Sequence, residues 1–322
     1  MAVQATRQRK LWNMPKQWWA RQSRRRKLAL AATIPALLVL LAWSLLPAVR
    51  AYTLVRNNRS QAAPNPAQAG IPVQNVSFAA SDGVRLAGWL AIASPRAPTI
   101  ILVHGFKGSR VDMLPWARFL YAAGYNVLLF DDRGCGQSDG WGIALGAREQ
   151  DDVIGAVRYL QGRKDLTKKR FGALGISLGA GIVLLAAARE PALAAVVADS
   201  AWTDEHAQLD RMGSVPAGRF ALPVLPYEPA LVDWLIGARL EDTRPLAVIG
   251  QIAPRAVFLI HSADDKNATT PLSGEAQLYA AAGAPKQQWI APSGGHTGAL
   301  AAHTAEYEQR VLAFFAQYLG AA

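Results

Sequence analysis

Ser177 is the residue of this chain whose surroundings most suggest covalent chemistry. It stands at the centre of GISLG, residues 175–179, which is a G-x-S-x-G pattern. The β-rich run RFGALGI precedes it, and the helix-patterned run LGAGIVLLAAARE follows it. A serine at such a sharp strand-to-helix turn has an exposed hydroxyl, and small neighbours allow the close approach. The N-terminus of the following helix directs free N–H groups towards a developing oxyanion.

A serine hydroxyl needs a base to take its proton and an acid to orient that base. Among the five histidines, His296 lies in a glycine-flanked loop, APSGGHTGAL, after the last predicted strand. Asp264 and Asp265 follow the predicted strand AVFLIHS, and either can supply the acid. Loops at the carboxyl ends of parallel strands gather at one edge of a sheet. The predicted order along the chain is therefore Ser177, an aspartate, then His296.

The elements that must position these residues are short β-rich runs, which from the third run onward alternate with longer helix-patterned segments. Runs such as TIILV and AAVVA are apolar on both faces, which is typical of a parallel sheet covered by helices on both sides. The first two runs, joined by AASDG, predict an antiparallel hairpin with Asp82 and Gly83 at its turn. The predicted strands are VQNVSF, VRLAGWLAI, TIILVHG, NVLLFD, RFGALGI, AAVVADS, AVFLIHS and KQQWIAP.

One interval, at about 202–252, breaks this alternation. Its aromatic and proline-rich centre, GRFALPVLPYEPALVDWLIG, predicts a helical cap insertion over the strand ends. Connections of this length usually have structure and often function. An ordinary crossover connection with extra turns is the alternative.

Several segments together resemble the α/β-hydrolase superfamily over residues from about 73 to 319. ILVHGFKGSR resembles the oxyanion-loop segment after strand three, LLFDDRGCGQSDG resembles the loop after strand four, and GGHTGAL resembles the region of the base. The resemblance implies an α/β-hydrolase fold: a mostly parallel eight-stranded sheet with helices on both faces and the cap insertion. By the family pattern H-G-x-x-D it makes Asp265 the acid, although Ser262 replaces the usual glycine. It assigns the oxyanion hole to the backbone N–H groups of Phe106 and Leu178.

The N-terminal part of the chain predicts one transmembrane helix. Residues 28–49, LALAATIPALLVLLAWSLLPAV, carry no charged side chain. A helix of this length spans about 33 Å, close to the thickness of the hydrocarbon core of a bilayer. Basic residues are more numerous before this segment than after it, which predicts a cytoplasmic N-terminus and an extracytoplasmic catalytic domain. A cleaved signal peptide is the alternative, because Val49 and Ala51 offer a small-residue cleavage site.

We therefore expect a basic cytoplasmic tail at 1–27, a transmembrane anchor at 28–49, a linker at 50–72 and the hydrolase domain at 73–322. The net charge of +11 belongs to the N-terminal part, because residues 1–59 hold twelve Lys and Arg and no acidic residue. The rest of the chain has 22 basic and 23 acidic residues, which disfavours a nucleic-acid partner. The single cysteine, Cys135, excludes an intrachain disulfide.

These observations predict a serine hydrolase that cleaves a carboxylic ester or thioester through an acyl-enzyme, with no metal and no organic cofactor. The expected partners are a small-molecule acyl substrate, with a lipid as one candidate, and a membrane that the N-terminal helix contacts. The anchor and the insertion are similar to those of membrane-anchored BEM46-like α/β-hydrolase-domain proteins.

Three alternatives are weighed against this prediction. Serine aminopeptidases share the same motifs, so a serine peptidase or amidase on the same fold is one alternative. A catalytically dead, membrane-tethered binding protein is another. A dinucleotide-binding oxidoreductase is disfavoured because neither RGCGQSDG nor GALGISLGAG contains G-x-G-x-x-G.

Overall fold

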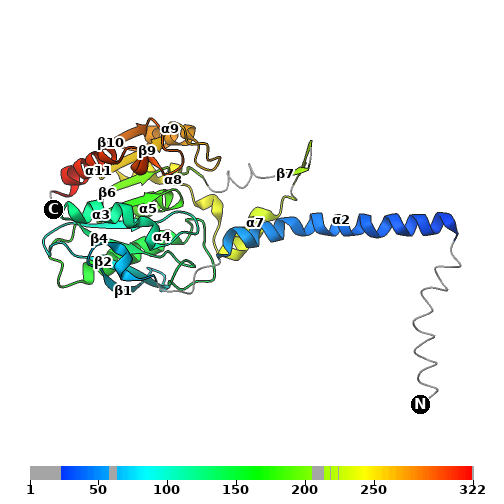
Figure 1. The fold of residues 1–322 in the computed structure, drawn as a ribbon, viewed down its shortest axis with the longest axis horizontal. Coiled ribbons are helices and arrows are strands. Elements are labelled where there is room, and N and C mark those ends of the chain that lie inside the picture. The colour runs from blue at the N-terminus through cyan, green and yellow to red at the C-terminus, as the bar shows by residue number, and fades with distance from the viewer. Residues whose placement is uncertain (1–22, 58–63, 205–213, 218, 224, 321–322) are drawn as a thin grey trace, which may run out of the picture.

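The computed structural model describes residues 23–57, 64–204, 214–217, 219–223 and 225–320, and Figure 1 shows their arrangement. Eight strands form one sheet in the order β1-β2-β4-β3-β5-β6-β9-β10. Strands β1, β2 and β4 pair antiparallel, and the pairs from β4 to β10 are parallel. The strands are β1 (Gln74–Ala79), β2 (Arg85–Ala91), β3 (Thr99–Val103), β4 (Asn126–Phe130), β5 (Phe171–Ile176), β6 (Leu193–Asp199), β9 (Ala256–Ser262) and β10 (Lys286–Ala291).

Helices cover both faces of this sheet. One apolar core packs the sheet against α4, α5 and α9, and a second core packs its other face against α3, α10 and α11. Strands β3, β4, β5 and β9 are therefore buried along their whole length, as their continuous apolar runs predict. The helices are α3 (Leu114–Ala122), α4 (Glu149–Gly162), α5 (Leu178–Arg189), α9 (Leu272–Ala281), α10 (Ala299–Ala302) and α11 (Thr304–Leu319).

The predicted hairpin and the predicted mostly parallel sheet are both confirmed. Strands β1 and β2 pair directly, and the turn between them contains Gly83 with φ of 95°, in the left-handed region that favours glycine. Short 3₁₀ helices occur at η1 (Pro66–Ala69), η2 (Arg110–Met113), η3 (Leu240–Asp242) and η4 (Ile249–Ile252).

Helix α2 (Arg24–Val55) extends away from the sheet as a single long rod (Figure 1). Its stretch Arg26–Val55 is long and apolar enough, by length and composition, to cross a membrane. The helix continues to Val55, inside the range predicted as a linker, because Ala51 and Val55 are buried against the domain. Residues 1–22 of the predicted basic tail lie outside the described residues.

The insertion between β6 and β9 is mixed rather than purely helical. It contains a two-stranded hairpin, β7 (Ser214–Ala217) with β8 (Phe220–Pro223), and the helices α7 (Glu228–Ile236) and α8 (Pro245–Val248). Helix α7 packs against α2, and both α7 and the hairpin lie beside α2 in Figure 1. Arg50 of α2 pairs with Glu228 of α7 at 3.1 Å. The centre of the insertion therefore lies against the long helix.

Candidate active site

Ser177 occupies a sharp turn between β5 and α5, as its sequence context predicts. Its backbone has φ of 53° and ψ of −119°, a conformation that L-residues rarely adopt and that costs about 1–3 kcal/mol. Glycines are required on both sides, because a Cβ on Gly175 would lie 2.1 Å from the carbonyl oxygen of Gly179. A Cβ on Gly179 would lie 2.4 Å from the carbonyl oxygen of Val103. The G-x-S-x-G pattern is thus a steric requirement of this turn.

The structure brings Ser177, His296 and Asp265 together in one row. The Nε2 atom of His296 lies 2.8 Å from Oγ of Ser177. The Nδ1 atom of the same ring lies 2.9 Å from Oδ2 of Asp265. The serine follows β5, the aspartate follows β9 and the histidine follows β10, all at the carboxyl edge of the sheet.

The two adjacent aspartates have different environments. The side chain of Asp265 is fully buried, and its Oδ1 accepts a hydrogen bond from the N–H of Asn267 at 2.8 Å. Asp264 is exposed, and its Oδ1 accepts from the N–H of Gly295 at 2.8 Å, which lowers the pKa of its carboxyl group. The motif residues alone did not decide which of these two aspartates is the acid. In the structure, the carboxylate of Asp265 faces the imidazole of His296.

Two further side chains contact this row and were not singled out from the sequence. The Oγ1 atom of Thr270 lies 3.1 Å from Nδ1 of His296. The Nε2 atom of His261, at the end of β9, lies 3.3 Å from Oδ2 of Asp265. The spacing of His261, four residues before Asp265, is the one signal in the sequence that could have suggested this contact.

A chain of buried hydrogen bonds holds the loop of Thr297 against the sheet. Asp199, at the end of β6, accepts from the hydroxyls of Tyr307 at 2.9 Å and Ser200 at 3.0 Å. Trp116 Nε1 donates to the Tyr307 oxygen at 2.9 Å, and the N–H of Thr297 donates to Ser200 Oγ at 3.2 Å. Burial raises the pKa of Asp199 to about 6, although the bonds from Tyr307 and Ser200 lower it.

The two residues predicted to supply the oxyanion donors both lie near the serine. Leu178 is the first residue of α5, so its N–H has no acceptor within the helix. The loop of Gly105 and Phe106 runs directly beside Ser177, because a Cβ on Gly105 would lie 3.5 Å from the serine Cβ. Both Phe106 and Leu178 line the same pocket as Ser177.

That pocket has a volume of about 490 Å³ and is lined by apolar and polar side chains in similar number. Leu54, from the last turn of α2, contributes to its wall together with residues of the sheet edge. Trp202, from the start of the insertion, is buried and donates through Nε1 to the carbonyl oxygen of Leu178 at 3.0 Å. The remaining lining residues are Gly105, Phe106, Leu145, Ile176, Ser177, Asn267, Thr269, Thr270, His296 and Thr297.

Two charged residues of the loop after β4, Asp131 and Arg133, form ion pairs with other parts of the domain. Arg110 pairs with Asp131 at 2.7 Å, and Arg133 pairs with Asp152 at 2.6 Å and with Asp82 at 2.7 Å. Asp131, Arg133 and Asp152 are all buried. Within the part of the chain that the structure describes, no group of three or more His, Cys, Asp or Glu side chains is arranged to hold a metal ion.

Comparison with known sequences gives a family match and several relatives. Residues 16–224 match the family model described as X-Pro dipeptidyl-peptidase (S15 family). The uncharacterized protein YfhR of Salmonella typhimurium is 27% identical over 294 residues, covering 86% of this chain and 91% of that protein. The uncharacterized protein YqkD of Bacillus subtilis is 31% identical over 220 residues, covering 67% of this chain and 70% of that protein.

The fold of this chain resembles those of several solved structures. The esterase Pf2001 of Pyrococcus furiosus superposes with a TM-score of 0.66 at 22% identity, covering 82% of this chain and 100% of that one. The α/β hydrolase GrgF of a Penicillium species superposes with a TM-score of 0.62 at 23% identity, covering 77% of this chain and 99% of that one. The family match includes Ser177 and ends before Asp265 and His296.

Proposed function

The chain belongs to the family described as X-Pro dipeptidyl-peptidase (S15 family), within the α/β-hydrolase superfamily, and we propose that it is a serine hydrolase of carboxylic esters or thioesters. It is a hydrolase of the α/β-hydrolase type. The observation that carries the finer proposal is the 2.8 Å separation of Ser177 Oγ and His296 Nε2, with Asp265 behind the ring. We assign these three residues as nucleophile, base and acid.

In the first step, Oγ of Ser177 attacks the carbonyl carbon of the substrate while Nε2 of His296 takes the hydroxyl proton. The carbonyl oxygen becomes an oxyanion that accepts hydrogen bonds from the N–H groups of Leu178 and Phe106. Each such donor contributes about 3 kcal/mol to the stability of the transition state. The bond to the leaving alcohol or thiol then breaks, and His296 returns its proton to the leaving group.

In the second step, a water molecule attacks the acyl-enzyme, and His296 takes one of its protons. The tetrahedral intermediate releases the carboxylic acid, and the proton returns to Ser177. Asp265 accepts a hydrogen bond from Nδ1–H throughout, which holds the ring in the tautomer that leaves Nε2 free to act as a base.

The pocket supports an acyl substrate. Apolar side chains from the sheet edge, the insertion and α2 surround the serine, and such a lining stabilises a hydrocarbon chain through burial of apolar surface. We propose a lipid as one natural source of this acyl group. A dipeptidyl-peptidase activity is the second candidate, because the matched family is described by it.

Labelling with a fluorophosphonate probe tests the nucleophile. The full-length protein should react, and Ser177→Ala should lose the reaction while keeping its circular dichroism spectrum. Ser273→Ala, which changes an exposed serine at the start of α9, is the matched control and should react fully. Equal labelling of Ser177→Ala and the unaltered protein would contradict the proposal.

Hydrolysis rates separate the two candidate activities. We expect the protein to cleave p-nitrophenyl acyl esters faster than Xaa-Pro p-nitroanilides at matched concentration. The reverse order of kcat/KM would favour the peptidase.

We further propose that α2 anchors the chain in a membrane, with the N-terminus in the cytoplasm and the catalytic domain outside. The excess of basic residues before the apolar stretch supports this orientation. A periplasmic phosphatase fused after residue 60 should then be active in a bacterial host. A silent but stably produced fusion would reverse the orientation.

A further inference from the structure

The last turn of α2 forms part of the pocket that contains Ser177 and His296. Leu54 of this turn lines the pocket together with Phe106 and Leu145. We propose that Leu54 is a specificity-determining residue for the acyl group, and that the acyl chain enters the pocket along α2. This inference rests on the proposed esterase function.

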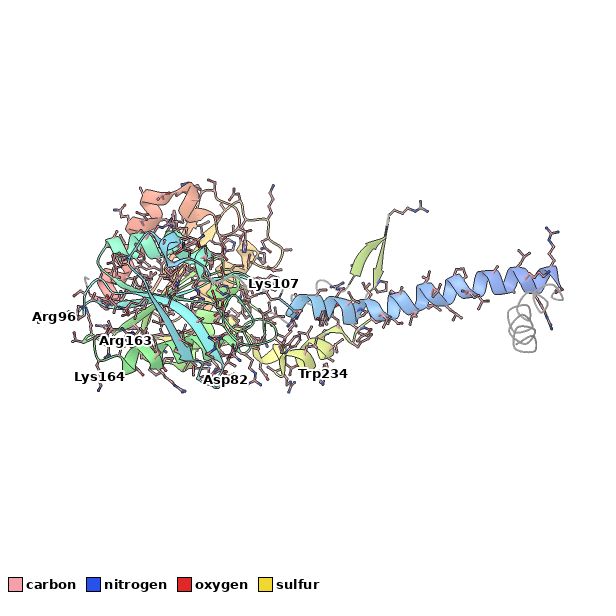
Figure 2. All side chains as sticks on the ribbon, turned by 60° about the horizontal axis from the view of Figure 1, so that its bottom comes forward. Asp82, Arg96, Lys107, Arg163, Lys164 and Trp234 are labelled. Atoms are coloured by element: carbon pink, nitrogen blue, oxygen red, sulfur yellow. The ribbon has the colours of Figure 1, made fainter. Side chains whose placement is uncertain are left out.

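The position of Leu54 is fixed by bonds from the residues on both sides of it. The Nζ atom of Lys107 donates to the carbonyl oxygen of Thr53 at 2.5 Å. The N–H of Ile143 donates to the carbonyl oxygen of Val55 at 2.9 Å. In Figure 2, Lys107 lies at the junction between α2 and the domain. The pocket wall at Leu54 is therefore held in place by the hydrogen bonds to Thr53 and Val55, the residues on either side of Leu54.

Packing fixes this turn as well. Ala51 and Val55 are almost completely buried in a small apolar cluster with Ile143, Leu145 and Val232, which come from the loop after β4 and from α7. Leu54 is itself half-buried. A side chain on a rigid, packed turn defines the shape of a pocket more sharply than one on a loop.

The same turn lies close to the end of the apolar stretch of α2. The uncharged stretch ends at Val49, and Leu54 is five residues further on, which is about 8 Å along a helix. Two exposed aromatic side chains belong to the last turns of α2 and to the pocket: Tyr52 is 52% exposed and Phe106 is 45% exposed. Trp234 is 75% exposed on α7, which packs against α2, and Figure 2 shows it beside the long helix.

Aromatic residues of this kind are enriched where a protein meets the membrane surface. With the apolar stretch in a bilayer, the pocket wall formed by Leu54 lies next to the bilayer surface. The acyl chain of an ester held in that bilayer then reaches Ser177 by moving along α2. The substrate class that fits is a long-chain acyl ester whose tail lies in the membrane.

A substitution that fills the pocket tests the role of Leu54. With the full-length protein in detergent, Leu54→Trp should lower kcat/KM for p-nitrophenyl palmitate by roughly tenfold or more, as a misplaced side chain of this size displaces apolar contacts. The loss on p-nitrophenyl acetate should be clearly smaller than the loss on the palmitate ester, since a short acyl group buries far less apolar surface in the pocket. Leu45→Trp changes the same residue type in the same helix at a position that is 52% exposed, and it should alter neither rate.

Fluorophosphonate labelling of each variant monitors the nucleophile separately. Full labelling of Leu54→Trp with a selective loss of palmitate hydrolysis supports the proposal. An identical acyl-chain profile for Leu54→Trp and Leu45→Trp overturns it, as does an equal loss on acetate and palmitate. If the unaltered protein neither reacts with the probe nor cleaves any ester, the proposed function itself has failed.

The entry route needs a second measurement. The full-length protein is reconstituted in phosphatidylcholine vesicles, and a non-exchanging fluorogenic long-chain acyl ester is placed either in the same vesicles or in separate ones. Entry along α2 from the bilayer predicts hydrolysis only when protein and ester share a vesicle. Equal rates in the two mixtures would overturn this part of the proposal.

Discussion

The Nε2 atom of His261 lies 3.3 Å from Oδ2 of Asp265, the same oxygen that contacts His296. The side chains of both His261 and Asp265 are fully buried. Burial lowers the pKa of His261, so that its ring is neutral near pH 7 and has one N–H to donate. His261 is thus placed to hold the carboxylate in position behind the base.

Replacing His261 with leucine should therefore weaken catalysis without abolishing it. The ring lies 3.3 Å from the carboxylate without a formed hydrogen bond, and its removal lets Asp265 shift, so kcat/KM for an ester should fall by roughly tenfold, as for a slightly displaced catalytic group. His261→Asn keeps an N–H donor and should retain more activity than His261→Leu. Ester hydrolysis with both purified variants measures this difference, and unchanged kcat/KM in His261→Leu would contradict a positioning role.

The two neighbouring aspartates offer a matched pair. Asp265→Asn should lower kcat by about three orders of magnitude or more, because an amide favours the wrong tautomer of His296. Asp264→Asn keeps an oxygen that accepts from Gly295 N–H, so its rate should stay within a few fold. Steady-state kinetics of the two variants, measured side by side, decide which aspartate acts as the acid. A larger loss in Asp264→Asn would reverse the assignment of the acid.

Tyr307→Phe should destabilise the fold more than it slows catalysis. The change removes the acceptor of Trp116 Nε1 and the donor to Asp199, and both partners are buried. Each unpaired buried group costs about 1–3 kcal/mol. Urea denaturation should show the lower free energy of unfolding, while fluorophosphonate labelling of Ser177 persists. A variant as stable as the unaltered protein would show that other groups satisfy these partners.

Glu275 predicts a pH dependence of stability. It is buried in α9, and burial raises the pKa of its carboxyl group to about 8, against a lowering by the hydrogen bond from Gln288. Because the folded-state pKa is above the ordinary glutamate value of 4.5, the unfolded chain releases the proton first as the pH rises. The contribution of this carboxyl group to stability is present at low pH and is lost between about pH 4.5 and 8.

Glu275→Gln mimics the protonated carboxyl group and should not titrate. Compared with the unaltered protein, its free energy of unfolding should therefore increase from about pH 5 to pH 8. Urea denaturation across this range measures the difference. A flat difference for Glu275→Gln would contradict the raised pKa.

The sheet and the turn at Ser177 were predictable because their signals are local. Eight β-rich runs matched eight strands, and the glycines around Ser177 satisfy a steric requirement within five residues. The meeting of Asp265 and His296 near Ser177 was predictable because the carboxyl ends of parallel strands lie at one edge of the sheet. The catalytic roles of these residues stay predictions until variants are measured.

Other features depend on contacts between distant parts of the chain. Nothing in the residues alone indicated which of Asp264 and Asp265 points inwards, because this depends on the path of the loop after β9. The packing of α7 against α2 and the position of Leu54 in the pocket follow from complementary surfaces that have no periodic pattern. Because of these contacts, α2 continues to Val55, within the range that the sequence predicted as a linker.

The attachment of α2 has a mechanical consequence. Val55 accepts a backbone hydrogen bond from Ile143, and Arg56 forms an isolated β-bridge with Gly142, so that the end of the helix is bonded directly to the loop after β4. A helix that is longer than the local hydrocarbon thickness tilts to match it. With α2 in a bilayer, the whole domain therefore leans with the helix. If α2 is such an anchor, we expect the distance between the pocket opening and the lipid surface to change with bilayer thickness, so that membrane composition would alter the rate of the proposed hydrolysis.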